Sequence, residues 1–174
     1  MEIKELEFKN IIAYLIPGVI GLYAISRHSS TISNLFVGGK QASEATSILL
    51  IVLLSLGIGI IINAITWAII RPIIECVGDT RPDLDYSKLN KDIMGAFKVI
   101  IDENFRYYQA YSNMFTSLII FLLFYIYKNS ILRGDIIVIT IFTCIVLFFA
   151  SRDSLNRSYR NMRLLLKQGE EIRK

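Results

Sequence analysis

The sequence predicts an all-α membrane protein with about four transmembrane helices, two of which extend into the cytoplasm as long helices. Apolar residues make up 53% of the 174-residue chain, which exceeds the 45–50% typical of soluble domains. They gather in long runs, and the run from Ser47 to Ile70 contains no charged residue. The 19 Lys and Arg residues are distributed unevenly between these runs, and this asymmetry predicts an orientation in the membrane.

The first and fourth apolar runs are marginal spans. Ile11–Ser26 and Ile136–Ser151 have 16 residues each and reach about 24 Å as helices, less than a hydrocarbon core of about 30 Å. Snorkelling side chains or local bilayer thinning can accommodate such lengths. For the first run, a re-entrant segment kinked at Pro17-Gly18 is the competing interpretation.

The second and third runs are the stronger spans. Ser47–Ile70 has 24 residues and reaches about 36 Å as a helix, enough to cross the hydrocarbon core. The third run extends from Met114 to Tyr127 and can continue back through uncharged residues to Tyr107. Trp67 near the end of the second run, and Tyr125 and Tyr127 at the end of the third, suit a membrane interface.

Basic residues indicate that both termini are cytoplasmic. With four spans, two Lys residues at the N-terminus, six Lys and Arg between spans two and three, and seven after span four fall on one side. Only Arg27, Lys40, Lys128 and Arg133 fall on the other side. The excess of positive charge marks the cytoplasmic face, so we expect the chain to lie in the bacterial inner membrane with the lipid bilayer as its first partner.

Helical periodicity continues beyond the membrane. Apolar residues recur every four positions at Leu89, Ile93, Phe97 and Ile101, which predicts an amphipathic helix leading into span three. A second stripe follows span four at Leu155, Tyr159, Met162 and Leu166. The expected segments are therefore an N-terminal transmembrane hairpin (1–70), a cytoplasmic amphipathic helical region (71–112), a second transmembrane hairpin (113–150) and a basic cytoplasmic helix (151–174).

Residue patterns typical of catalysis are missing from the sequence. His28 is the only histidine, and neither cysteines nor histidines occur at the spacing of metal ligands. No glycine-rich phosphate loop is present. We therefore expect no enzyme activity, no catalytic residues, no metal and no cofactor. The core of each span also lacks acidic and basic residues, which argues against a proton-coupled transporter.

One helical face of span two carries small and polar side chains. Ser55, Gly59, Asn63 and Thr66 follow at steps of four, four and three, so they form one stripe on a helix otherwise built of leucine and isoleucine. The Asn63 amide needs a partner in hydrocarbon. The stripe is either a helix-packing seam with an interhelical hydrogen bond or the lining of a pore in an oligomer, and the sequence leaves both open.

Two further groups of residues are candidate functional sites. A largely aromatic cluster lies where the third run enters the membrane. It forms either an interfacial belt or a collar at the cytoplasmic mouth of a pore. Its members are Arg106, Tyr107, Tyr108 and Tyr111. The C-terminal helix presents a basic surface, formed by Arg152, Arg157, Arg160, Arg163 and Lys167. This surface suits lipid headgroups, a subunit contact, or a polyanion. Only Tyr159 could stack on a base there, so direct nucleic-acid binding is not expected.

The layout resembles the small membrane-embedded accessory proteins of type VI-B CRISPR–Cas loci. The resemblance rests on two stretches, residues 105–114 leading into span three and residues 152–161 after span four. It implies a homo-oligomeric pore, octameric in that family, which acts with an RNA-guided RNA-cleaving effector to depolarise the membrane during phage infection. Some members carry an arginine–histidine ribonuclease motif, but here no histidine follows Arg152, so nuclease activity is not carried over.

The function expected from these observations is a homo-oligomeric pore or channel in antiviral defence. Each subunit would contribute a small or polar face, and a ring of such faces would enclose water. The alternative is a non-conducting membrane-anchored adaptor, whose cytoplasmic helices recruit a partner protein.

Overall fold

In a computed structural model of the chain, the described residues are 2–37, 44–77, 94–95, 98–99, 104–128 and 133–171, and nearly all of them are helical. The all-α fold class is thus confirmed over these residues. The expected amphipathic stripe from Leu89 to Ile101 lies outside them. The elements in chain order are α1 (Glu2–Ser26), α2 (Ser30–Val37), α3 (Glu44–Ile65), the π-helical turn η1 (Thr66–Ile70), α4 (Arg71–Val77), α6 (Arg106–Lys128) and α7 (Gly134–Glu171).

Three helical segments in the described part of the chain are long and apolar enough to cross a membrane. They are Ala45–Val77, Arg106–Tyr127 and Gly134–Lys167, and they contain the second, third and fourth apolar runs. The first run supplies a shorter apolar segment, Ile12–Ser26. It belongs to α1, which continues through Pro17 as one helix.

The helices continue past the ends of the apolar runs. α3 continues through η1 into α4, α6 begins well before residue 113, and α7 runs without a break from Gly134 to Glu171. The boundaries expected after residues 70, 112 and 150 therefore lie inside continuous helical segments. The α3–α4 segment continues even though Pro72 follows residue 70, and no proline lies in α6 or α7.

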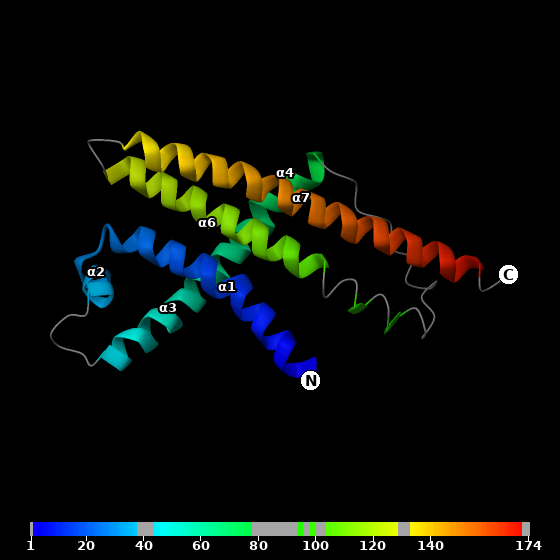
Figure 1. Cartoon of the computed structure of the whole chain (residues 1–174), viewed down its shortest axis with the longest axis horizontal. Coiled ribbons are helices and arrows are strands. Elements are labelled where there is room, and N and C mark those ends of the chain that lie inside the picture. The colour runs from blue at the N-terminus through cyan, green and yellow to red at the C-terminus, as the bar shows by residue number, and fades with distance from the viewer. Residues whose placement is uncertain are drawn as a thin grey trace.

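The helices form an elongated bundle whose two ends are easily distinguished (Figure 1). α6 and α7 pack side by side as an antiparallel pair, and α1 crosses α3 and also packs along α6. The α1–α2 connection, the start of α3, the end of α6 and the start of α7 lie at one end of the bundle, while both termini lie toward the other. We call these the connection end and the terminal end. Among the described basic residues, Arg27 directly follows α1 and Arg133 directly precedes α7 at the connection end, whereas Arg157, Arg160 and Arg163 lie on the part of α7 nearer the terminal end.

The outward faces of the long helices are apolar. In the three candidate spans, only 11% to 22% of the residues in the apolar windows are buried inside the chain. On α3, Ile48, Ile60 and Ile61 are each about 60% exposed, and on α7 Phe142 is 67% exposed. Surfaces of this size in a single chain need a cover of lipid or of other subunits. The fold is therefore compatible with membrane insertion.

Candidate functional site: the polar seam and the α4–α7 junction

The stripe Ser55, Gly59, Asn63 and Thr66, called here the polar seam, faces the interior of the bundle. Its first half forms the crossing of α3 with α1. A Cβ atom on Gly59 would collide with the backbone carbonyl of Tyr14, and a Cβ on Gly18 would collide with the carbonyl of Ser55. The two helices thus meet backbone to backbone, and glycine is required on both.

Asn63 is the centre of an amide cluster that joins three helices. Its Oδ1 accepts hydrogen bonds from Nε2 of Gln109 at 2.9 Å and from Nδ2 of Asn113 at 3.2 Å, both on α6. Gln109 Nε2 also donates to the Tyr14 hydroxyl at 2.8 Å, and Asn113 Nδ2 donates to the Ala13 carbonyl at 3.1 Å, both on α1. The side-chain oxygen of Asn63 is therefore satisfied within one chain, as a polar atom in hydrocarbon must be.

Thr66 extends the seam by one further contact with α6. Its Oγ1 lies 2.7 Å from Oγ1 of Thr116, and the Thr66 side chain is fully enclosed. The partners on α6 are Gln109, Asn113 and Thr116, which follow one another at steps of four and three residues. The same two steps separate Gly59, Asn63 and Thr66 in the polar seam. This second stripe was not among the residues predicted from sequence, although the same periodicity marks it.

Two oxygen atoms of this interior have no hydrogen-bond partner in the described chain. They are Oγ of Ser55 and Oδ1 of Asn113, and both residues are 0% exposed. In this single chain, then, the polar seam is an internal packing surface between α3, α1 and α6. The residues proposed from sequence as one group do lie together, with their polar atoms directed at neighbouring helices.

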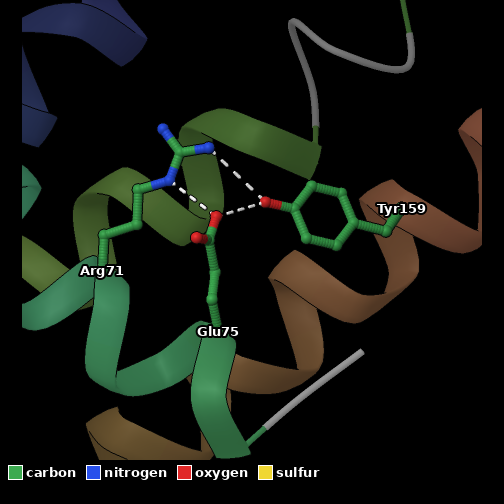
Figure 2. A network of polar contacts seen from close by, with 3 residues as sticks. All are labelled: Arg71, Glu75 and Tyr159. Carbon is green, nitrogen blue, oxygen red and sulfur yellow. Dashed lines mark hydrogen bonds and ion pairs between the residues drawn. The ribbon is translucent and has the colours of Figure 1, made fainter. Parts of the chain in front are cut away.

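A second polar contact joins α4 to α7 (Figure 2). Arg71 Nε donates to Glu75 Oε1 at 2.8 Å, the Tyr159 hydroxyl donates to the same Glu75 oxygen at 2.6 Å, and Arg71 Nη2 lies 3.4 Å from the Tyr159 hydroxyl. The three side chains form a triangle, in which Glu75 and Tyr159 are 84 residues apart in sequence. We call it the α4–α7 junction.

Aromatic and aliphatic side chains enclose this junction. The Arg71 guanidinium lies 4.2 Å from the centre of the Trp67 ring and 5.9 Å from that of Phe105, within the range of cation–π attraction. The π-helical turn η1 directly precedes Arg71, a local geometry often found at functional positions. Beneath the polar triangle lies an apolar core, formed by Ile70, Ile74, Tyr108, Leu155, Tyr159 and Met162.

The four members of the expected aromatic mouth occupy different environments. Tyr107 is 52% exposed and stacks on Tyr111 with ring centres 6.4 Å apart. Arg106 and Tyr111 are half-buried. Tyr108, by contrast, is 2% exposed, and its hydroxyl has no partner in the described chain. Tyr108 therefore belongs to the core of the bundle, while the other three lie nearer its surface.

The basic residues of α7 form a surface at the terminal end. Arg157 is exposed and pairs with Asp153, with Nη2 and Oδ2 2.8 Å apart, and Arg160, Arg163 and Lys167 are also exposed. Arg152 is half-buried, and its Nε is enclosed without a hydrogen-bond partner. Tyr159 is buried in the α4–α7 junction, so it offers no platform for a stacked base.

The connection end carries far fewer charges. There Arg133 pairs with Asp135, with Nη2 and Oδ2 2.7 Å apart, and the hydrogen bond to this carboxylate raises the pKa of Arg133. Both side chains are exposed, so the pair contributes little to stability.

Among the residues that the structure describes, no three His, Cys, Asp or Glu side chains are grouped as a metal site would require. Comparisons with protein-family models, with curated proteins and with solved structures yield no match.

Proposed function

We propose that the chain is the subunit of a homo-oligomeric pore in the bacterial inner membrane, with four crossing helices and both termini in the cytoplasm. The observation that carries this proposal is the wide apolar surface that α3 and α7 leave uncovered in the single chain. Lipid can cover one part of this surface, and neighbouring copies the rest. The uneven division of Lys and Arg residues between the segments that join the apolar runs supports the orientation.

The lining of such a pore has to come from contacts between copies. The residues of the polar seam form hydrogen bonds and close packing contacts with other helices of the same chain. The seam is therefore not free to face water. In a ring of subunits, the extended terminal end of α7 would place several exposed cations around one mouth. Cations at a mouth raise the local concentration of anions, and we therefore expect a preference for anions over cations.

The antiviral setting of this proposal rests on the resemblance to the type VI-B accessory proteins. If it holds, the assembly is an octamer that depolarises the membrane when an RNA-guided RNA-cleaving effector detects phage RNA. The layout of apolar spans followed by a basic helix is what supports this assignment, and the link to the effector is functional and requires no direct binding of nucleic acid.

Ion flux through liposomes that contain the purified full-length protein tests the pore. We expect flux above that of empty liposomes and a closed-ring mass in native mass spectrometry. Changing Arg157 and Arg160 together to Gln should move the reversal potential toward cation preference, since both side chains are exposed and outside the polar seam. The matched change of both residues to Lys keeps the charge and should keep the selectivity. Absence of flux from a folded ring would contradict the pore.

A non-conducting adaptor is the second candidate function. It is favoured by the exposed terminal end of α7, where Leu164 is 55% exposed next to Arg160 and Arg163. An apolar side chain among cations suits a contact with a soluble protein. Absence of flux, together with binding of a soluble partner that Leu164→Glu abolishes, would support the adaptor over the pore.

A further inference from the structure

An apolar groove of about 340 Å³ lies between α6 and α7. Phe115, Ile119 and Leu122 of α6 face Ile141, Ile145 and Phe149 of α7 across it. These residues belong to the two candidate spans Arg106–Tyr127 and Gly134–Lys167. When both helices cross a bilayer, the groove is therefore surrounded by hydrocarbon, where only an apolar group can fill it.

A cation follows the groove-lining residues along α7. Arg152 follows Phe148 by four residues and Phe149 by three, so it lies on the same face of α7, about one turn further toward the terminal end. No acidic side chain of the described chain pairs with it, and its enclosed Nε lacks a hydrogen-bond partner. Its guanidinium retains donors that fit a phosphate group.

The depth of Arg152 matches the headgroup region. Asp135, the charged residue near the start of α7, precedes Arg152 by 17 positions, which corresponds to about 26 Å of helix. A hydrocarbon core is about 30 Å thick, so when Asp135 lies at one interface Arg152 lies near the other. From there the groove extends back toward the bilayer centre over about 12 Å, the length of the helix from Ile141 to Phe149.

We propose that this groove and Arg152 form a binding site for one anionic phospholipid. The phosphate lies against the Arg152 guanidinium, and one acyl chain lies in the groove between α6 and α7. Charge complementarity at one end and an apolar lining along the rest distinguish this occupant from a helix of a second copy, which would leave the unpaired cation uncompensated. The inference depends on membrane insertion of α6 and α7 and is independent of ion conduction.

Native mass spectrometry of the full-length protein, in detergent with equal amounts of phosphatidylglycerol and phosphatidylcholine, measures the lipids retained. We expect phosphatidylglycerol to be retained preferentially, and Arg152→Gln to lower this preference about fivefold, the effect of one interfacial cation. Arg152→Lys should keep most of it. Arg27→Gln removes one exposed charge at the connection end and should change nothing. An equal effect of Arg152→Gln and Arg27→Gln would overturn the proposal.

Filling the groove tests its apolar half. Ile145→Trp, or the milder Ile141→Phe if the first variant fails to fold, should lower the retention of both lipids. Phe142→Trp enlarges an outward side chain that does not line the groove and serves as the control. If a folded variant with a filled groove retains as much lipid as the wild type does, the groove holds no acyl chain and the proposal is wrong. The same conclusion follows if the variant no longer forms the oligomer but its lipid retention is unchanged.

Discussion

Gly59 of α3 packs directly against the backbone carbonyl of Tyr14 in α1, so closely that no Cβ atom fits between them. The reciprocal contact, between Gly18 and the carbonyl of Ser55, repeats this geometry on the other side of the crossing. α1 and α3 thus touch through their backbones. This contact fixes the position of Ser55, Asn63 and Thr66 relative to α1.

We expect Gly59→Ala to lower the free energy of unfolding by about 1–3 kcal/mol, the usual effect of overpacking. Gly57→Ala provides the matched control because it lies on the same helix with nothing within 4 Å of a Cβ. It should be neutral or stabilising by up to about 1 kcal/mol. Thermal unfolding in detergent, followed by circular dichroism, measures both. Equal effects of the two substitutions would mean that α1 and α3 do not cross at Gly59.

The hydrogen bond between Asn63 and Asn113 should be detectable as a coupling energy. A double-mutant cycle with Asn63→Leu and Asn113→Leu should give about 0.6 kcal/mol, and no more than about 1.7 kcal/mol, as for other interhelical hydrogen bonds in membranes. A cycle that pairs Asn63→Leu with Tyr159→Phe should give a value near zero, since the Tyr159 hydroxyl bonds to Arg71 and Glu75 in a separate group of contacts. Coupling of similar size in both cycles would contradict the amide cluster.

Tyr159→Phe should loosen α4 from α7 while leaving the rest of the bundle intact. The substitution removes the hydrogen bond to Glu75 and the contact with Arg71, together about 1.5 kcal/mol. We therefore expect amide hydrogen exchange in α4 to become about tenfold faster. Tyr127→Phe is the control because Tyr127 is 86% exposed. Unchanged exchange in α4 would show that the junction does not hold this helix.

The two ends of the bundle should react with reagents from opposite sides of the membrane. Cys76 on α4 is exposed, whereas Cys144 is buried. A maleimide that does not cross membranes should therefore label Cys76 in inside-out vesicles and not in intact spheroplasts. In a variant with both cysteines changed to Ser, Ser30→Cys, exposed at the connection end, should show the reverse. Labelling of both positions from the same side would refute the proposed orientation.

The positions of the helices were largely predictable from the sequence. Uncharged runs such as Ser47–Ile70 predict spans because length and apolarity are local properties of the chain. The apolar stripe after the fourth run also predicts that helix continues there, as it does in α7, whereas the continuation of α3 through η1 into α4 was not predicted. The α4–α7 junction was missed altogether. The spacing of Arg71 and Glu75 suits a pair on one helix, but nothing local indicates that Tyr159 completes it.

The sequence by itself determined the helical class, the apolar outer surfaces and the stripe of Ser55, Gly59, Asn63 and Thr66. Periodicity defines which side chains share a helix face, because that depends only on the turn of the helix. The tertiary structure alone decided what this face meets. Gln109 and Asn113, about 50 residues away in sequence, bond to Asn63 because helix packing brings α6 there. The same stripe facing a water-filled ring would look identical in sequence.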